Sequence, residues 1–85
     1  MFYVYVIKSK KDNQFYFGST NNLNRRLDEH NAGLVFSTKS RGPFELVYYE
    51  AYKSESDARK REKNLKLRSR AFAQLKKRIQ GSVLC

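Results

Sequence analysis

Apolar residues are grouped along the chain in short runs that predict a small α/β protein. Residues 2–7 are aromatic or β-branched throughout, which is typical of a β-strand. The polar residues 11–14 supply a turn, and a second aromatic run at residues 15–18 returns as the other strand of a hairpin. Residues 44–52 are again rich in apolar and aromatic side chains, and we expect them to form a third strand.

The length of the hairpin turn decides which tyrosines share a face of the predicted sheet. A two-residue turn at Asp12-Asn13 would place residue 9 opposite residue 16. Because side chains alternate between the faces of a strand, Tyr5 and Tyr16 would then lie on the same face. A longer loop could break this alignment.

A first helix is predicted over residues 22–31. Thr20 and Asn21 are good N-cap residues before it, and Gly33 suits the position just after its end. Two leucines four positions apart form its apolar stripe, and Arg26 and His30 flank that stripe. Both polar side chains should therefore lie at the edge of the buried face. Residues 34–43 are rich in polar and basic side chains, which predicts an exposed loop.

Glu62 stands out on the second predicted helix, which Ser54 opens. Ala58, Glu62 and Leu65 recur at helical spacing, so the carboxylate falls on the apolar face. Residues 59–78 hold ten Lys or Arg and no other acid. A carboxylate in that position either forms intrahelical ion pairs or has a specific role.

The C-terminal part predicts a last helix capped by Ser69 and stopped by Gly81. Its inward-facing residues are expected to be Phe72, Leu75 and Ile79. The element order ββαβαα favours a small α/β sandwich with a three-stranded, mainly antiparallel sheet flanked by helices. We expect one domain over residues 1–81 and a loose tail over residues 82–85.

The charge of the chain points to a polyanionic partner. Its 85 residues include 18 Lys and Arg against 8 Asp and Glu, a formal net charge of +10. Nucleic acid is favoured over the alternative, an anionic membrane, since no segment approaches the roughly 18–20 apolar residues of a spanning helix. The cations expected to contact phosphates are Lys39, Arg41, Lys60, Lys63 and Arg70. Because the single cysteine, Cys85, cannot form an internal disulfide, we expect a cytoplasmic protein.

The candidate chemistry centres on Glu62 and the tyrosines, each with a structural alternative. Glu62 could pair with Lys66 or Arg59, or it could bind a hard cation such as Mg²⁺, which often needs only one or two carboxylates. Strand tyrosines usually serve packing, but a nearby metal-bound water or arginine lowers the pKa of a phenol towards the useful range. Zinc is disfavoured because one histidine and one distant cysteine are too few ligands.

Four short motifs follow one another along the chain. They are Tyr3-Val4-Tyr5, Tyr16-Phe17-Gly18 after ten intervening residues, Asn22-Leu23-x-x-Arg26-Leu27-x-x-His30, and Glu62-x-Asn64-Leu65. Together they resemble the GIY-YIG nuclease superfamily, and above all its small stand-alone bacterial members related to the N-terminal domain of the excinuclease C subunit. The resemblance covers about residues 2–68. Tyr3 and Phe17 stand where the family name has a glycine and an isoleucine.

The resemblance implies hydrolysis of DNA with one divalent metal ion, Mg²⁺ or Mn²⁺. Glu62 would hold the metal, and Tyr5 or Tyr16 would assist deprotonation of the attacking water. Arg26 would stabilise the charge that develops on the phosphate, and His30 would relay a proton. Cleavage would leave a 5′-phosphate and a 3′-hydroxyl. The glycine of the second tripeptide would let the strand turn sharply into the helix.

The expected partner is DNA, with branched, nicked and single-stranded forms as candidate substrates in repair or recombination. We expect no small-molecule cofactor, no membrane partner, and a monomer or weak homodimer. The competing interpretation is a catalytically inactive basic module that binds DNA or RNA. It makes no demand on Glu62 or the tyrosines, so the two interpretations differ in whether the candidate residues converge on one concave pocket.

Overall fold

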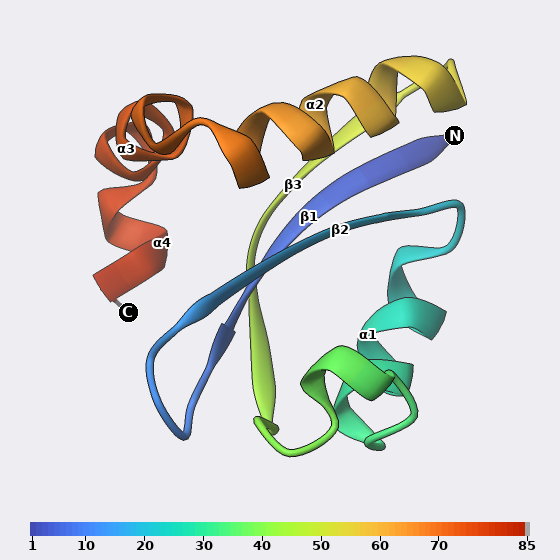
Figure 1. The fold of residues 1–85 in the computed structure, drawn as a ribbon, viewed down its shortest axis with the longest axis vertical. Coiled ribbons are helices and arrows are strands. Elements are labelled where there is room, and N and C mark those ends of the chain that lie inside the picture. The colour runs from blue at the N-terminus through green and yellow to red at the C-terminus, as the bar shows by residue number, and fades with distance from the viewer. Residues whose placement is uncertain (85) are drawn as a thin grey trace.

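The computed structural model describes residues 1–84 as a three-stranded sheet with helices on both faces (Figure 1). The strands are β1 (Phe2–Ser9), β2 (Phe15–Thr20) and β3 (Phe44–Tyr52). The helices are α1 (Leu23–Asn31), η1 (Phe36–Thr38), α2 (Glu55–Leu67), α3 (Ser69–Arg78) and α4 (Gln80–Leu84). The strand order is β2-β1-β3 and both pairings are antiparallel, which confirms the predicted fold class.

The hairpin loop is longer than predicted, but the predicted shared face holds. Tyr16 pairs with Ile7, two positions from the expected partner, because four residues separate the paired Ser9 and Gln14. A shift of two positions restores the same alternation of side chains. Tyr5 and Tyr16 therefore do lie on one face, packed in the same cluster.

Each face of the sheet is covered by a different helix (Figure 1). On the face covered by α1, termed the α1 face, Tyr5, Ile7 and Phe44 are buried against leucines of the helix. On the opposite face, termed the α2 face, Val4 and Val6 pack against the apolar side of α2 and against α3. Because side chains alternate along β1, this strand contributes residues to two separate hydrophobic clusters, one on each face.

Helix α1 begins one residue later than its predicted caps. Neither Thr20 nor Asn21 is the N-cap, because the Asn22 Oδ1 accepts the hydrogen bond from the Arg25 amide at 3.1 Å. The predicted glycine at its end is confirmed. Gly33 has a φ of +75°, and its amide and that of the next residue return to carbonyls in the last turn of α1.

The C-terminal region departs from the predicted single helix and loose tail. Arg68, rather than Ser69, is the N-cap of α3, and α3 ends at Arg78. Gly81 does not stop a helix, since it lies within the short helix α4. Residues 82–84 of the expected loose tail belong to that helix, and Cys85 lies outside the described residues. Across residues 1–84, none of the helices has the length and hydrophobicity needed to cross a membrane.

Candidate active site

Three side chains form a buried hydrogen-bonded chain on the α1 face. The Tyr5 hydroxyl on β1 lies 2.8 Å from Nε2 of His30 on α1, and Nδ1 of His30 lies 2.7 Å from Oγ1 of Thr38. All three side chains are at most 2% exposed. A neutral imidazole donates through one nitrogen and accepts through the other, so these hydrogen bonds run in one direction. His30 therefore fixes the position of the Tyr5 hydroxyl.

Burial keeps this chain of side chains uncharged near pH 7. It lowers the pKa of His30 to about 4, and the positive charge of Arg26 acts in the same direction. Burial also raises the pKa of the Tyr5 hydroxyl, although the Arg26 guanidinium acts to lower it. Because His30 is a weak base here, moving a proton from Tyr5 to His30 is strongly unfavourable.

Gly18 on β2 makes room for the Tyr5 ring. The two residues are cross-strand partners, and a Cβ atom at Gly18 would lie only 2.3 Å from the Tyr5 hydroxyl oxygen. The ring therefore lies across β2, the edge strand, because this position has no side chain. The expectation that Gly18 turns the strand into the helix is wrong, since β2 continues to Thr20.

Tyr16 lies beside the buried chain and is partly exposed. Its ring packs edge-on against the His30 imidazole, with 5.2 Å between the ring centres. Its hydroxyl accepts a hydrogen bond from Ser37 Oγ at 3.3 Å. The Lys66 ammonium of α2 lies 5.7 Å from the centre of the same ring. Tyr16 thus links the α1 face to the edge of α2.

Glu62 extends from α2 to the β2 edge of the sheet. Its Oε1 accepts a hydrogen bond from Ser19 Oγ at 2.6 Å, and its Oε2 lies 2.7 Å from the Lys66 ammonium. Of the two ion-pair partners considered from the sequence, Lys66 is therefore the one observed. Arg59 pairs instead with Glu55, at 3.3 Å. Glu62 and Tyr16 thus both lie near the same lysine.

The candidate residues do not line a single pocket. Tyr5 is buried, and Arg26 lines a cleft of about 300 Å³ together with Ser19. Glu62 lines a second cleft of about 290 Å³ on α2. Arg59 lines both clefts, so they adjoin. The candidate residues lie around the β2 edge, and the Glu62 charge is close enough to raise the pKa of the Tyr5 hydroxyl. The surface at this edge nevertheless consists of two clefts instead of one pocket.

The donor set around Glu62 suits a cation held largely by water and substrate. In residues 1–84, no group of three or more His, Cys, Asp or Glu side chains is placed to hold a metal ion. A hard divalent cation can be bound by one carboxylate when waters and a phosphate supply the other oxygens. Lys66 now pairs with Oε2 of Glu62, and its side chain is 42% exposed, so the ammonium would stay hydrated if a cation took its place.

The cations expected to contact phosphates lie on separate surfaces. Lys39 lies over the Phe36 ring at 4.8 Å, and Arg41 is paired with Asp12 at 3.3 Å, both at the loop end of the sheet. The other three expected cations are Lys60, Lys63 and Arg70, on α2 and α3. Their role in binding stays a prediction.

Sequence reasoning missed two polar residues that hold the site. Thr38 binds the far nitrogen of His30, and Ser19 binds Glu62. Ser19 follows the second tripeptide directly, so its place next to a motif was the available signal. Thr38 gave no signal, because it lies in the predicted exposed loop and becomes fully buried only when η1 packs against α1.

Comparison with known proteins supports the motif assignment. A family model described as the GIY-YIG catalytic domain matches residues 1–78. The chain is 46% identical to the UPF0213 protein SH2523 of Staphylococcus haemolyticus over 69 residues, which are 80% of this chain and 83% of that protein. It is 43% identical to the UPF0213 protein CPE1444 of Clostridium perfringens over 67 residues, 78% of this chain and 71% of that one.

A solved structure has the same fold. It is the solution NMR structure of the UPF0213 protein BH0048 from Bacillus halodurans, with a TM-score of 0.53 and 36% sequence identity over 88% of this chain and 82% of that chain. The fold, the order of the motifs and the family match agree on one class of protein, the nucleases that carry this catalytic domain. The chain belongs to the GIY-YIG family, and its similar relatives are small UPF0213 proteins.

Proposed function

We propose that this protein is a divalent-metal-dependent endonuclease that hydrolyses DNA phosphodiester bonds. The observation that supports the proposal best is the approach of Glu62 and Tyr16 to one lysine at the β2 edge, beside the buried Tyr5. These residues come from three different elements, β1, β2 and α2. Packing of those elements alone does not explain why their polar groups lie together. DNA, with a role in repair or recombination, is the substrate that the family and the charge of +10 favour.

Glu62 is the residue that would hold Mg²⁺ or Mn²⁺. Such a cation, when bound, neutralises charge on the scissile phosphate and lowers the pKa of a coordinated water. Ser19 keeps Oε1 of Glu62 in place through its 2.6 Å hydrogen bond. Oε2, which now pairs with Lys66, would be the metal ligand, and Lys66 would then remain near the phosphate as a counter-charge.

The remaining residues bind the phosphate and orient the attack. Arg26 lines the cleft at the β2 edge and presents a planar, permanently charged group to the phosphate. Tyr16 is partly exposed and, in its phenolate form, would accept a proton from the attacking water. Tyr5, the alternative base, is buried and would first have to lose its own proton. His30 holds the Tyr5 hydroxyl and is too weak a base to store its proton, so we assign it a positioning role instead of a relay.

Cleavage of nicked, branched and supercoiled DNA in Mn²⁺ tests this function. We expect cleavage that EDTA abolishes, with 5′-phosphate and 3′-hydroxyl ends. Glu62→Gln should reduce the rate by roughly two orders of magnitude or more, since it removes the metal ligand. Asp57→Asn is the matched control, because it removes a carboxylate from an exposed position on the same helix. Equal activity of Glu62→Gln and Asp57→Asn would refute the proposed mechanism.

The occupied carboxylate supports a second candidate, the inactive binding module. Both oxygens of Glu62 already have protein partners, as the intrahelical ion-pair interpretation requires. A titration with Mn²⁺, followed by electron paramagnetic resonance, separates the candidates without a cleavage assay. Saturable binding that Glu62→Gln removes favours the nuclease. DNA binding without Mn²⁺ binding and without cleavage favours the module.

A further inference from the structure

A wide cleft lies away from Glu62, between α2 and α3. Its volume is about 680 Å³. It is lined by Arg61, Asn64, Leu67, Arg68, Arg70, Ala71, Gln74, Leu75 and Arg78. We call it the arginine groove. None of these lining residues is acidic, and two of them are amides that donate and accept hydrogen bonds. The groove is therefore suited to an anion that also offers polar edges.

Arginines and lysines are separated on these two helices. Residues 59–78 contain five arginines and five lysines, and four of the arginines but none of the lysines line the groove. A general attraction for polyanions makes no distinction between the two cations. The planar guanidinium differs from an ammonium in binding phosphate through two parallel hydrogen bonds and in stacking on flat rings. The separation therefore points to a ligand with phosphates and bases.

Three of the four arginines have free head groups. Arg61 is held by Glu50, at 3.0 Å. In the described part of the chain, the side chains of Arg68, Arg70 and Arg78 have no ion-pair or hydrogen-bond partner, and all three are exposed. The positive charges of these three arginines repel one another, and no acidic residue lines the groove to offset that repulsion. An anion bound in the groove would therefore be stabilised.

The arginine groove continues to the candidate active site across the C-terminal half of α2. A small cleft beside it is lined by Lys63 and shares Asn64 and Arg68 with the groove. The cleft that holds Glu62 is also lined by Lys63. Leu67 lines all three clefts, and it is 71% exposed. Cations and one exposed apolar residue thus mark an unbroken path.

We propose that the arginine groove binds a flanking segment of single-stranded DNA whose other part lies at Glu62. The strand crosses α2 at Leu67, where an unpaired base contacts the apolar side chain, and its phosphates then meet Arg68, Arg70 and Arg78. A duplex would bury its bases and leave Leu67 without that contact. The inference extends the proposed function to a substrate class, but it requires only DNA binding and no cleavage.

Binding of oligonucleotides of two lengths in EDTA tests the groove. Strands of about 4 nucleotides should fill one end of the path, and strands of about 12 nucleotides should reach both ends. We expect the longer strand to bind wild-type protein at least about tenfold more tightly, with a salt dependence steeper by about 0.7 per added phosphate contact. Arg70→Gln combined with Arg78→Gln should remove most of that gain.

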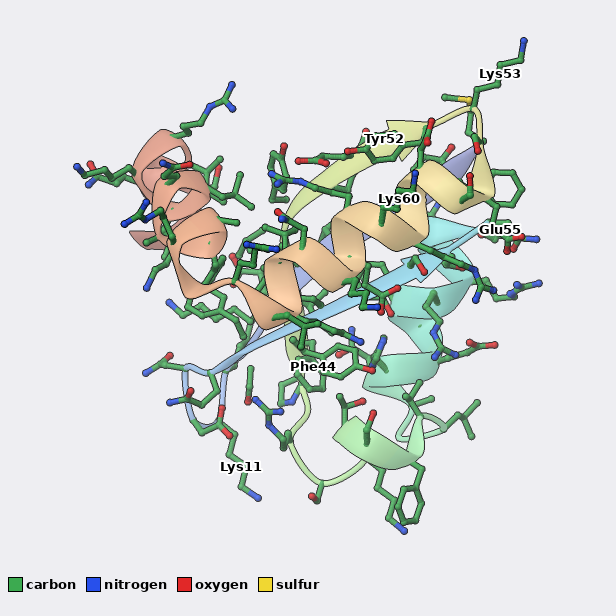
Figure 2. All side chains as sticks on the ribbon, turned by 45° about the horizontal axis from the view of Figure 1, so that its top comes forward. Lys11, Phe44, Tyr52, Lys53, Glu55 and Lys60 are labelled. Carbon is green, nitrogen blue, oxygen red and sulfur yellow. The ribbon has the colours of Figure 1, made fainter. Side chains whose placement is uncertain are left out.

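Lys53→Gln combined with Lys77→Gln is the charge-matched control. Lys53 points away from the molecule (Figure 2), and Lys77 is on α3 but outside the arginine groove. We expect this pair to keep the length-dependent gain. Replacing Arg70 and Arg78 by Lys keeps the charge and should retain the salt dependence while weakening binding, which excludes misfolding as the cause.

Two results would overturn the proposed groove. One is an equal loss of affinity in the arginine pair and the lysine pair, which would make the attraction a general effect of charge. The other is an unchanged gain with strand length in the arginine pair. Because all of these measurements are made in EDTA, an inactive enzyme does not affect them. Glu62→Gln should lose most of its cleavage in Mn²⁺ and yet keep the gain with strand length in EDTA.

Discussion

The buried polar cluster on the α1 face is neutral, whereas the one on the α2 face is an ion pair. Tyr5, His30 and Thr38 share hydrogen bonds between uncharged groups. On the other face, the Arg61 guanidinium of α2 donates three hydrogen bonds to the Glu50 carboxylate of β3, at 3.0–3.2 Å. Both clusters attach a helix to the sheet, but only the first includes candidate catalytic residues, Tyr5 and His30.

Glu50 is satisfied entirely by its protein neighbours. Although burial acts to raise its pKa, hydrogen bonds from Arg61, Tyr52 and Tyr48 lower it overall. Burial and the same carboxylate raise the pKa of each of these tyrosines to about 12. Every polar group in the cluster thus has its partner inside the fold, as a structural role requires.

Glu50 and Glu62 show that burial alone does not distinguish a structural carboxylate from a candidate metal ligand. Their side chains are similarly enclosed, at 17% and 19% exposure. The difference lies in the partner. Glu50 pairs with Arg61, which is 27% exposed and also donates a hydrogen bond to Asn64. Glu62 pairs with a lysine that is 42% exposed. A carboxylate can exchange its partner for a metal only when that partner can leave.

The largest effect on stability should come from breaking the charged cluster. We expect Arg61→Ala to lower the free energy of unfolding by about 2–4 kcal/mol, because it leaves Glu50 enclosed without its counter-charge. Urea denaturation measures this loss. Arg59→Ala, which breaks an exposed pair on the same helix, should cost no more than about 1 kcal/mol. Equal losses in the two variants would mean that the Glu50 cluster is not structural.

The second largest effect should be a dependence of the free energy of unfolding on pH, caused by His30 in the neutral cluster. The unfolded chain binds a proton at His30 near pH 6.5, but the folded protein binds it only near pH 4. The stabilisation is therefore complete above about pH 6.5 and is lost as the pH falls towards 4, by about 2–3 kcal/mol. Denaturation of wild type and His30→Gln across this range measures the difference, and the chain has no other histidine. Parallel stability curves would contradict the assignment.

A smaller effect is expected where Gly18 meets Tyr5. Gly18→Ala should destabilise the protein by about 1–2 kcal/mol and reduce cleavage, because the new methyl group displaces the buried tyrosine ring. Gly81→Ala is the control, since a Cβ atom there meets nothing within 4 Å. Thermal melting measures both variants. If Gly18→Ala melts at the wild-type temperature, the ring can shift at no cost and the glycine serves another purpose.

Much of the fold could be predicted because local patterns specify it. The apolar and aromatic runs at residues 2–7, 15–18 and 44–52 predicted the three strands, and helical spacing predicted α1 and α2. The shared face of Tyr5 and Tyr16 survived an error in loop length because the error was an even number of residues. The short helix α4 was not predicted, since Gly81 is a poor helix residue in any local scale.

Contacts between distant segments were beyond such patterns. Glu50 and Arg61 meet only because α2 folds back across β3, and nothing in the spacing of eleven residues between strand and helix signals that pairing. The separation of arginines from lysines is likewise invisible along residues 59–78, because α2 and α3 must first pack to form the groove. The burial that lowers the pKa of His30 to about 4 is also not visible along the chain, because residues distant in sequence enclose the ring.

The sequence by itself determined the family, the order of strands and helices, and the identity of the candidate residues, because each depends on neighbours within a few positions or on motif order. Only the tertiary structure decided how those residues are placed and paired. Distance and burial set the pKa of His30, the partners of Glu62 and the grouping of arginines in the arginine groove. These properties depend on contacts between residues that are distant in sequence, and patterns of neighbouring residues do not specify such contacts.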